Sequence, residues 1–164
     1  MGERGRHMTL QSVIAIDPGA THNGVALFTI SMNPETGLPE CDCTFTTEHT
    51  PEGLFDNLTV WGAMRGNPKG SFDVMVVEKF VLYPEKAASL AYSELRTVEV
   101  IGVLRERCRQ EGVAFVTQPA SIKKATEGQL RARGIKLKSR GSGNHAHDAE
   151  LHGYHYWLRV RAGL

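Results

Sequence analysis

Three acidic residues stand where their side chains could meet and carry out chemistry together. Asp17 closes the apolar run S-V-I-A-I-D, Glu78 closes V-M-V-V-E, and Asp148 lies in H-A-H-D-A. Carboxylates brought together repel one another unless cations lie between them. Clusters of oxygen ligands suit Mg²⁺ or Mn²⁺. A pair of such ions can activate a water and stabilise the leaving oxygen of a phosphodiester. The three acids therefore predict a two-metal hydrolytic site.

Each acid also has a purely structural interpretation. Asp-Pro-Gly at 17–19 is a common turn sequence. Glu78 could be an exposed strand end, and Asp148 could be an acid favoured by the dipole at a helix N-terminus. The positions are nevertheless related, because two of the acids end expected strands and the third lies at an expected helix start. Such positions can converge at one edge of a sheet, which favours the metal site.

The elements that would position these acids follow from the apolar pattern. Strands are expected over 12–17, 24–30, 43–47, 72–77 and 113–117, and helices over 51–64, 84–111 and 145–161. A strand meander followed by alternating helices and strands predicts an α/β fold, with a mixed five-stranded sheet flanked by helices. We expect one domain over 12–164, preceded by a flexible arm over 1–11.

The expected helix over 84–111 carries more apolar surface than one face requires. Residues at three- and four-residue steps form one stripe, which consists of Ala87, Ala91, Leu95, Val98, Ile101, Leu104 and Cys108. Val100 and Val103 lie off this stripe, so we expect a second face of the helix to be covered as well. A helix with two apolar faces is a candidate for a dimer interface.

Positive charge is concentrated between the last expected strand and the last helix. Residues 119–144 contain one acidic residue, Glu127, and seven basic residues: Lys123, Lys124, Arg131, Arg133, Lys136, Lys138 and Arg140. A basic segment on an otherwise acidic chain suits a polyanion such as nucleic acid. The alternative is a solvated, flexible loop. Because glycines are frequent in the segment, we expect it to be poorly ordered until DNA binds.

The remaining composition restricts the setting more than the activity. Charged residues make up 23% and hydrophobic residues 41% of the chain, as in ordinary globular proteins. No apolar run approaches the ~20 residues of a membrane span. Three cysteines without an apolar export signal indicate reduced thiols in a cytoplasmic protein, nucleoid-associated if prokaryotic or viral. The C-x-C pair at 41–43 lacks the further ligands that a zinc site needs.

Four segments carry a resemblance to a known family. In chain order they are I-D-P-G-A-T-H-N-G, V-V-E-K-F, P-A-S-I-K-K-A-T-E-G and N-H-A-H-D-A-E-L, and the match spans 13–156. They resemble the motifs of the RuvC family of Holliday junction resolvases, which have a ribonuclease H-like fold. The resemblance implies a Mg²⁺-dependent endonuclease that resolves four-way DNA junctions. It also implies a homodimer, for which the helix over 84–111 is the expected interface.

The resemblance implies a role for each matching residue. Asp17 would bridge two Mg²⁺ ions, for which Mn²⁺ could substitute, and Glu78, His145 and Asp148 would complete the metal site. Lys123 matches the conserved lysine and would stabilise the charge of the scissile phosphate. The residues expected to contact DNA are Lys123, Lys124, Arg131, Arg133, Lys136, Lys138 and Phe80.

The histidines near Asp148 leave two interpretations open. His145, Asp148 and His152 share one helix face at i, i+3 and i+7. They could form a structural zinc site. Alternatively, His145 is a metal ligand or proton shuttle of the catalytic site, and His152 supports that site or lies on the surface. His147 and His155 lie off this face and receive no role.

Three departures from the family pattern keep other functions open. The connector over 128–144 is short and lacks the family's second lysine. Phe80 lies two residues after Glu78, where the family has its aromatic residue three after, and Glu150 replaces a leucine. These differences keep open a broader nuclease that cuts forks and flaps, or a catalytically silent junction-binding module. The complete set of acids argues against the silent module.

Overall fold

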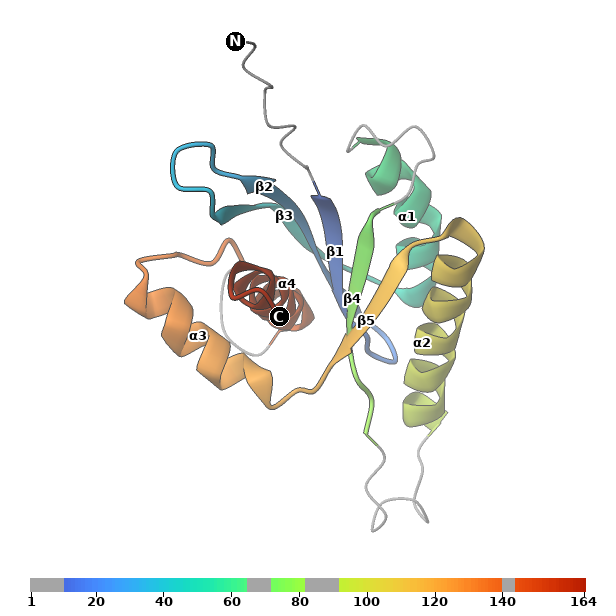
Figure 1. Cartoon of the computed structure of the whole chain (residues 1–164). Helices are drawn as coiled ribbons and strands as arrows, with labels where there is room; N and C mark the ends of the chain where they lie inside the picture. The colour runs from blue at the N-terminus through green and yellow to red at the C-terminus, as the bar shows by residue number, and fades with distance from the viewer. Residues whose placement is uncertain (1–10, 65–71, 82–91, 140–143) are drawn as a thin grey trace.

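The computed structural model describes residues 11–64, 72–81, 92–139 and 144–164 (Figure 1). Its elements are β1 (Gln11–Asp17), β2 (Asn23–Met32), β3 (Pro39–His49), α1 (Pro51–Met64), β4 (Val74–Glu78), α2 (Tyr92–Glu111), β5 (Ala114–Gln118), α3 (Ile122–Ala132) and α4 (His145–Arg161). Of the arm expected over 1–11, only Gln11 lies among the described residues, and it is the first residue of β1.

The five strands form one mixed sheet in the order β3-β2-β1-β4-β5. β1, β2 and β3 pair antiparallel, whereas β4 pairs parallel with β1, and β5 parallel with β4. Parallel neighbours need a crossover connection. α1 lies in the connection before β4, and α2 lies between β4 and β5. The expected α/β fold, a mixed five-stranded sheet flanked by helices, is confirmed.

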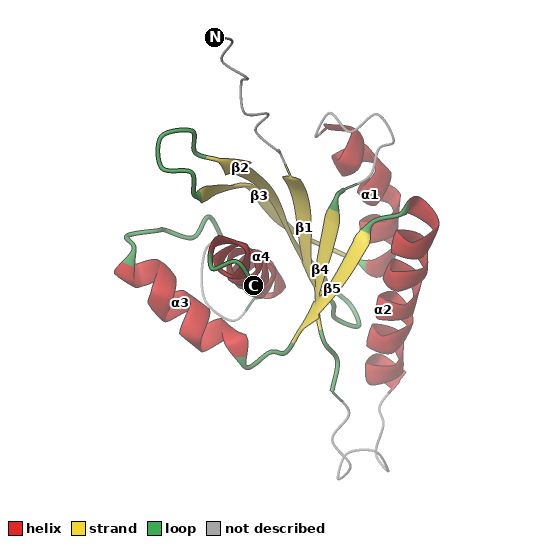
Figure 2. Cartoon of the chain, viewed as in Figure 1, coloured by secondary structure: helices red, strands yellow, loops and turns green. Residues whose placement is uncertain are grey.

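Helices cover both faces of the sheet, with α1 and α2 on one face and α3 and α4 on the other (Figure 2). Successive side chains of a strand point to opposite faces. On β1, Val13 and Ala15 join the core beneath α4, whereas Ile14 and Ile16 join the core beneath α1 and α2. Because β1 and β4 are buried on both faces, they have continuous apolar sequences rather than alternating ones.

Two glycines allow α4 to approach the sheet closely. A Cβ atom at Gly24 of β2 would lie 1.8 Å from the carbonyl oxygen of His145, at the first residue of α4. A Cβ atom at Gly153, farther along α4, would lie 2.0 Å from Cε2 of Phe28 on β2. A Cβ atom at either position would overlap its neighbour, so Gly24 and Gly153 cannot be replaced by a larger residue without a shift of α4 or β2. The position of the first turn of α4 is therefore fixed against β2.

A helix lies where the sequence predicted an unstructured connector. α3 buries Thr126 and Leu130, which are four residues apart on one face. It ends where Gly134 adopts a positive φ of 69° and Ile135 donates its backbone N–H to the carbonyl oxygen of Leu130, a Schellman motif. The expected disorder is therefore wrong over 122–139, and residues 140–143 lie outside the described part of the chain.

The apolar stripe expected on the long helix is wrong in part. The side chains of α2 that enter the core include Val100, Leu104 and Cys108. Leu95 and Val98 of the expected stripe are instead about half exposed, at 49% and 46%, and Val103 of the expected second face is 49% exposed. The core face thus runs through Val100, which had been placed off the stripe. The first residues of the expected helix, including Ala87 and Ala91, lie outside the described residues.

Cys41, Cys43 and Cys108 are free thiols in the structure, and Cys43 and Cys108 are buried. Within the ranges that the structure describes, no helix is both long and apolar enough to cross a membrane.

Candidate active site

The three acids predicted to meet do meet, at one edge of the sheet. Asp17, Glu78 and Asp148 each offer a carboxylate oxygen, and these atoms lie within 4.8 Å of one another. β1 and β4 are parallel neighbours, with Ile16 beside Val77, so Asp17 and Glu78 leave the sheet side by side. Asp148 comes from the first turn of α4, which packs across these strands.

Lys123 of α3 places its ammonium group between two of the carboxylates. Its Nζ lies 3.0 Å from Oε2 of Glu78 and 2.6 Å from Oδ2 of Asp148. Burial opposes the charge of this lysine, but its hydrogen bonds to Asp148 and Glu78 outweigh burial and raise the pKa of Lys123. Burial also opposes the charge of Glu78, yet hydrogen bonds from His152 and Lys123 lower the pKa of Glu78 to about 2.

His145 pairs with the most buried carboxylate of the cluster. Its Nδ1 lies 2.6 Å from Oδ2 of Asp17, and this hydrogen bond raises the pKa of His145. Burial raises the pKa of Asp17 by more than the bond with His145 lowers it. The contact depends on Gly19, where a Cβ atom would lie 2.9 Å from Cε1 of the His145 ring and 2.3 Å from the carbonyl oxygen of His22.

His152 belongs to the interior of the site and is completely buried. Its Nε2 lies 2.8 Å from Oε2 of Glu78, and its Nδ1 lies 2.9 Å from Oε1 of Gln118. Its two ring nitrogens thus contact other groups of the protein. In the described part of the chain, metal-ligand spacing is found for the three carboxylates and not for His145, Asp148 and His152 as a set. The structural zinc alternative therefore has no support.

The donor set of the carboxylate cluster suits a hard divalent cation. Three carboxylates, with the imidazole of His145 beside Asp17, offer the oxygen and nitrogen ligands that Mg²⁺ or Mn²⁺ accepts. The ammonium group of Lys123 offsets part of the negative charge between Glu78 and Asp148. The residues therefore fit the metal chemistry that the sequence predicted.

The expected DNA-binding residues separate into two groups. Lys123 points into the carboxylate cluster, whereas Lys124, Arg131, Arg133 and Lys136 are exposed along α3 and the turn that follows it. Lys138, also exposed, lies 4.0 Å from Asp42 of β3. Arg131 has one acidic neighbour, Glu127, at 3.7 Å. These exposed side chains lie on an ordered helix and the residues that follow it. We call them the basic surface, which consists of Lys124, Arg131, Arg133, Lys136 and Lys138.

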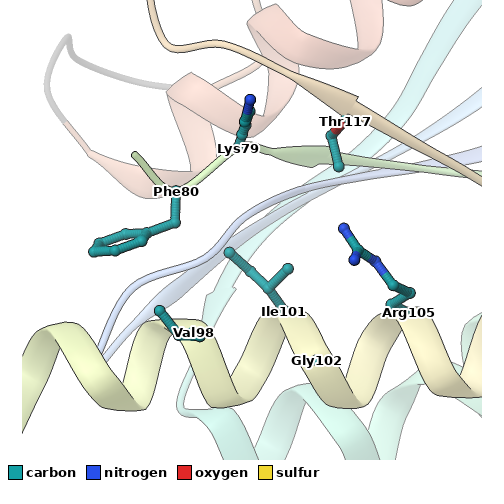
Figure 3. A pocket seen from close by; sticks show the side chains of 7 residues that line it. All are labelled: Lys79, Phe80, Val98, Ile101, Gly102, Arg105 and Thr117. Atoms are coloured by element: carbon teal, nitrogen blue, oxygen red, sulfur yellow. The ribbon is translucent and has the colours of Figure 1, made fainter. Parts of the chain in front are cut away.

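Phe80 lies away from this basic surface, in a groove between the end of β4 and α2. Figure 3 shows its ring directed toward α2, near Val98 and Ile101. The groove has a volume of about 290 Å³, and Arg105 and Thr117 line its other end. The predicted contact between Phe80 and DNA would have to form at this groove.

Glu150 has a role that the sequence comparison could not assign. It is completely buried, and its carboxylate accepts hydrogen bonds from the backbone N–H groups of Lys138 and Ser139, each at 2.8 Å. The hydroxyl of Ser139 donates to it as well, at 2.7 Å. The side chain of Glu150 therefore joins residues 138 and 139, which follow α3, to the buried face of α4 by hydrogen bonds. The clue in the sequence is a charged residue on the apolar face of the last helix.

Gln118 is the residue of this region that the sequence analysis did not consider. It ends β5 directly beside Glu78 in the parallel register, and its side chain is buried. The signal in the sequence was that β5 ends on a glutamine, just as β4 ends on a glutamate. The sequence leaves open whether His152 supports the site or lies on the surface, and its complete burial excludes the surface.

The comparisons with known proteins concern the fold. No protein-family model and no curated protein matches the sequence. T. thermophilus RuvC, solved in complex with Holliday junction substrate, matches with a TM-score of 0.62 at 15% identity, over 94% of this chain and 97% of that chain. The fowlpox virus Holliday junction resolvase matches with a TM-score of 0.55 at 9% identity, over 92% and 99%. The chain therefore has the ribonuclease H-like fold that RuvC and the poxviral Holliday junction resolvase share.

Proposed function

We propose that this protein is a metal-dependent endonuclease that resolves four-way DNA junctions by paired phosphodiester hydrolysis. The observation that carries the proposal is the cluster of Asp17, Glu78 and Asp148, with the ammonium group of Lys123 between Glu78 and Asp148. The cluster lies on a fold shared with Holliday junction resolvases, one of them solved with its junction substrate. A fold alone does not determine an activity, so the proposal depends on the side chains at the site.

Two Mg²⁺ ions, or Mn²⁺ in their place, would be held by Asp17, Glu78, Asp148 and His145, and would supply an activated water and a stabilised leaving oxygen. Lys123 would then exchange its carboxylate contacts for the phosphate, where its positive charge stabilises the transition state. His145 is about two-fifths exposed, so it can reach a ligand or a water from solvent. Asp17 orients this imidazole through Nδ1.

The basic surface supplies the contact with the DNA backbone. Its residues lie on α3 and the following turn, and Lys123 at the start of the same helix enters the carboxylate cluster. One rigid helix thus connects the phosphate-binding surface with the site of cleavage. Contacts to phosphates fix position and affinity rather than base preference. We therefore assign junction affinity to this surface, in a protein that acts on DNA inside the cell.

Paired cuts require two active sites related by symmetry, so the proposal includes a homodimer. α2 provides the candidate interface, because Leu95, Val98 and Val103 are exposed apolar residues on a helix that already fills its core face. The groove of Phe80 and Val98 borders the same helix (Figure 3). A second copy of the chain, packed on α2, would cover Leu95, Val98 and Val103 and supply the second site.

The decisive experiment compares four-way, three-way, flap and linear DNA of one sequence, incubated with the purified protein and Mg²⁺. A junction resolvase cuts the four-way substrate in two symmetric strands and spares the linear duplex. Comparable cutting of flaps and three-way junctions would instead identify the broader branched-DNA nuclease. Binding of the four-way junction without any cut, in both Mg²⁺ and Mn²⁺, would identify a silent junction-binding module.

A further inference from the structure

The side chain of His152 connects the candidate metal site with the interior of the sheet. It lies one helical turn after Asp148 on α4 and is completely buried. Its ring bridges two neighbouring strands, with Nε2 at 2.8 Å from Glu78 at the end of β4 and Nδ1 at 2.9 Å from Gln118 at the end of β5. The three side chains form a continuous chain that ends on a carboxylate of the site.

The direction of the hydrogen bond to Glu78 follows from its chemistry. A carboxylate only accepts hydrogen bonds, so Nε2 of His152 carries the proton and donates it to Oε2. Lys123 donates to the same oxygen, at 3.0 Å. The hydrogen bonds from His152 and Lys123 therefore both end on Oε2 of Glu78. They hold the carboxylate in one orientation, and Oε1 takes no part in either bond.

Packing alone does not account for a histidine and a glutamine at these positions. Burial of polar groups costs free energy unless they are hydrogen-bonded, and apolar side chains would fill the same space at lower cost. Gln118 is 2% exposed, and its Nε2 has no hydrogen-bond partner in the part of the chain that the structure describes. In a neutral ring that carries its proton on Nε2, Nδ1 is an acceptor, and the amide oxygen of Gln118 cannot donate to it. The contact is a hydrogen bond when the Gln118 amide is turned so that its Nε2–H group donates to Nδ1, which also gives that amide nitrogen a partner.

We propose that His152, backed by Gln118, is a positioning residue that holds Glu78 in the orientation required for metal binding. This inference rests on the proposed function, because it assumes that Glu78 is a metal ligand. Groups that hydrogen-bond to metal ligands fix ligand geometry, and their loss commonly weakens metal affinity about 10- to 100-fold. Among the four motif segments of the sequence, the last ends at Leu151, so His152 is not part of the motif that identifies the carboxylates.

The test is a titration of the full-length protein with Mn²⁺ in the absence of DNA, with free Mn²⁺ measured by electron paramagnetic resonance. His152→Leu removes the donor and should raise the dissociation constant for Mn²⁺ about 10- to 100-fold. His152→Gln retains an N–H group that can reach Glu78, and should recover most of the affinity. The matched control is His155→Leu on the same helix, because His155 contacts Thr126 rather than the carboxylates, and it should bind Mn²⁺ as the wild type does.

Gln118→Leu tests the chain of contacts without altering a neighbour of the metal site on α4. It removes the partner of Nδ1 and should weaken Mn²⁺ binding several-fold, but only while His152 is present. In the His152→Leu background the same change should have little further effect, because the two residues act as one unit. If His152→Leu does not fold, an unchanged Mn²⁺ affinity in Gln118→Leu is sufficient to overturn the inference.

The outcomes separate this inference from the proposed function. Mn²⁺ binding that is absent in the wild type, or equal in Asp17→Asn and the wild type, overturns the metal site and the inference with it. Mn²⁺ binding that is lost in Asp17→Asn but unchanged in His152→Leu leaves the metal site intact and overturns the role of His152. Loss in His152→Leu with recovery in His152→Gln supports the positioning role, which a purely structural histidine would not produce.

Discussion

Asp17 is the residue on which the candidate site depends most, because it is buried and contacts His145 beside the other two carboxylates. Asp17→Asn keeps the shape of the side chain but removes its negative charge. Loss of a metal ligand removes several kcal/mol of transition-state stabilisation, which corresponds to a rate that is ~10²–10⁴-fold lower. Junction binding should persist or tighten, since less negative charge faces the phosphates. Cleavage assays and gel-shift titrations measure the two effects, and cleavage at the wild-type rate would contradict the assignment.

The pair of His145 and Asp17 also predicts how the metal-free protein responds to pH. The folded protein raises the pKa of His145 above 6.5 through its hydrogen bond with Asp17. The resulting stabilisation is fully present below pH 6.5 and is lost as the pH rises through the higher pKa of the folded state. Because the ring is partly exposed, the contribution should stay below ~1 kcal/mol. Thermal melts in EDTA should show a smaller decline in stability above neutrality for His145→Gln than for the wild type, and parallel pH profiles would reject the prediction.

At the scale of elements, Glu150 joins the end of the connector to α4. Glu150→Ala leaves two backbone N–H groups and the hydroxyl of Ser139 without their buried acceptor. We expect the free energy of unfolding to fall by about 2–4 kcal/mol, because unsatisfied buried donors are costly. Chemical denaturation measures this change, and Glu35→Ala at an exposed turn is the control. Equal stability of Glu150→Ala and the wild type would show that the tether is dispensable.

The proposed homodimer interface lies on α2 and can be tested by a single substitution. Val98→Glu places a charge on the exposed apolar face of this helix, where a second copy is proposed to pack. Buried unpaired charge is strongly unfavourable, so the variant should sediment as a monomer at concentrations where the wild type is a dimer. Val60→Glu on α1 introduces the same charge at another exposed valine and should leave the dimer intact. A wild type that sediments as a monomer would refute the proposed interface.

The sequence predicted most elements correctly, and its errors have local causes. Apolar runs located β1, β2 and β4 because these central strands are buried on both faces. The edge strand β3, which has many exposed residues, was predicted over 43–47 and extends over Pro39–His49. α3 was missed because Gly128 and many charged residues obscured the spacing of Thr126 and Leu130, which alone face the core. Exposed and core-facing valines of α2 could not be separated by spacing, because burial there depends on which side of the helix meets the sheet. Pairing across the sheet, as between Glu78 and Gln118, needs the tertiary structure.

For the molecule as a whole, the structure replaces the flexible basic loop expected from the sequence with a basic surface on an ordered helix. Because α3 is an ordered helix, its charges would meet DNA at fixed spacing rather than on a flexible loop. Each phosphate contact contributes about −0.9 to the slope of log K against log salt. Replacing Arg131, Arg133, Lys136 and Lys138 with alanine should flatten that slope by roughly two to four units and weaken binding on all sequences alike.

The control for this measurement is Arg109→Ala on α2, whose guanidinium is exposed and pairs with Glu106. It removes a positive charge outside the basic surface and should leave the salt slope unchanged. Lys123→Ala should reduce turnover with a smaller effect on junction affinity, because its ammonium group lies among the carboxylates. An unaltered slope in the quadruple variant would place the DNA-binding surface elsewhere on the molecule.

For the site as a whole, the sequence predicted which carboxylates come together but not which side chains hold them in position. The convergence of Asp17, Glu78 and Asp148 could be expected, since each closes or opens a recognisable element. The bridge through His152 could not, because it links the interior of α4 with two strand ends that are adjacent only in the folded sheet. Which groups become neighbours in this way is a property of the topology rather than of any motif.

The distance along the chain between the parts of the site has a consequence for protein synthesis. Asp17 and its partner His145 are separated by 128 positions, and α4 follows every strand of the sheet. A ribosome therefore releases Asp17, Glu78 and Lys123 well before the helix that carries His145, Asp148 and His152. Domains fold as their segments emerge, but this site stays incomplete until translation has passed α4. A nascent chain consequently lacks the fully assembled site until α4 has left the ribosome.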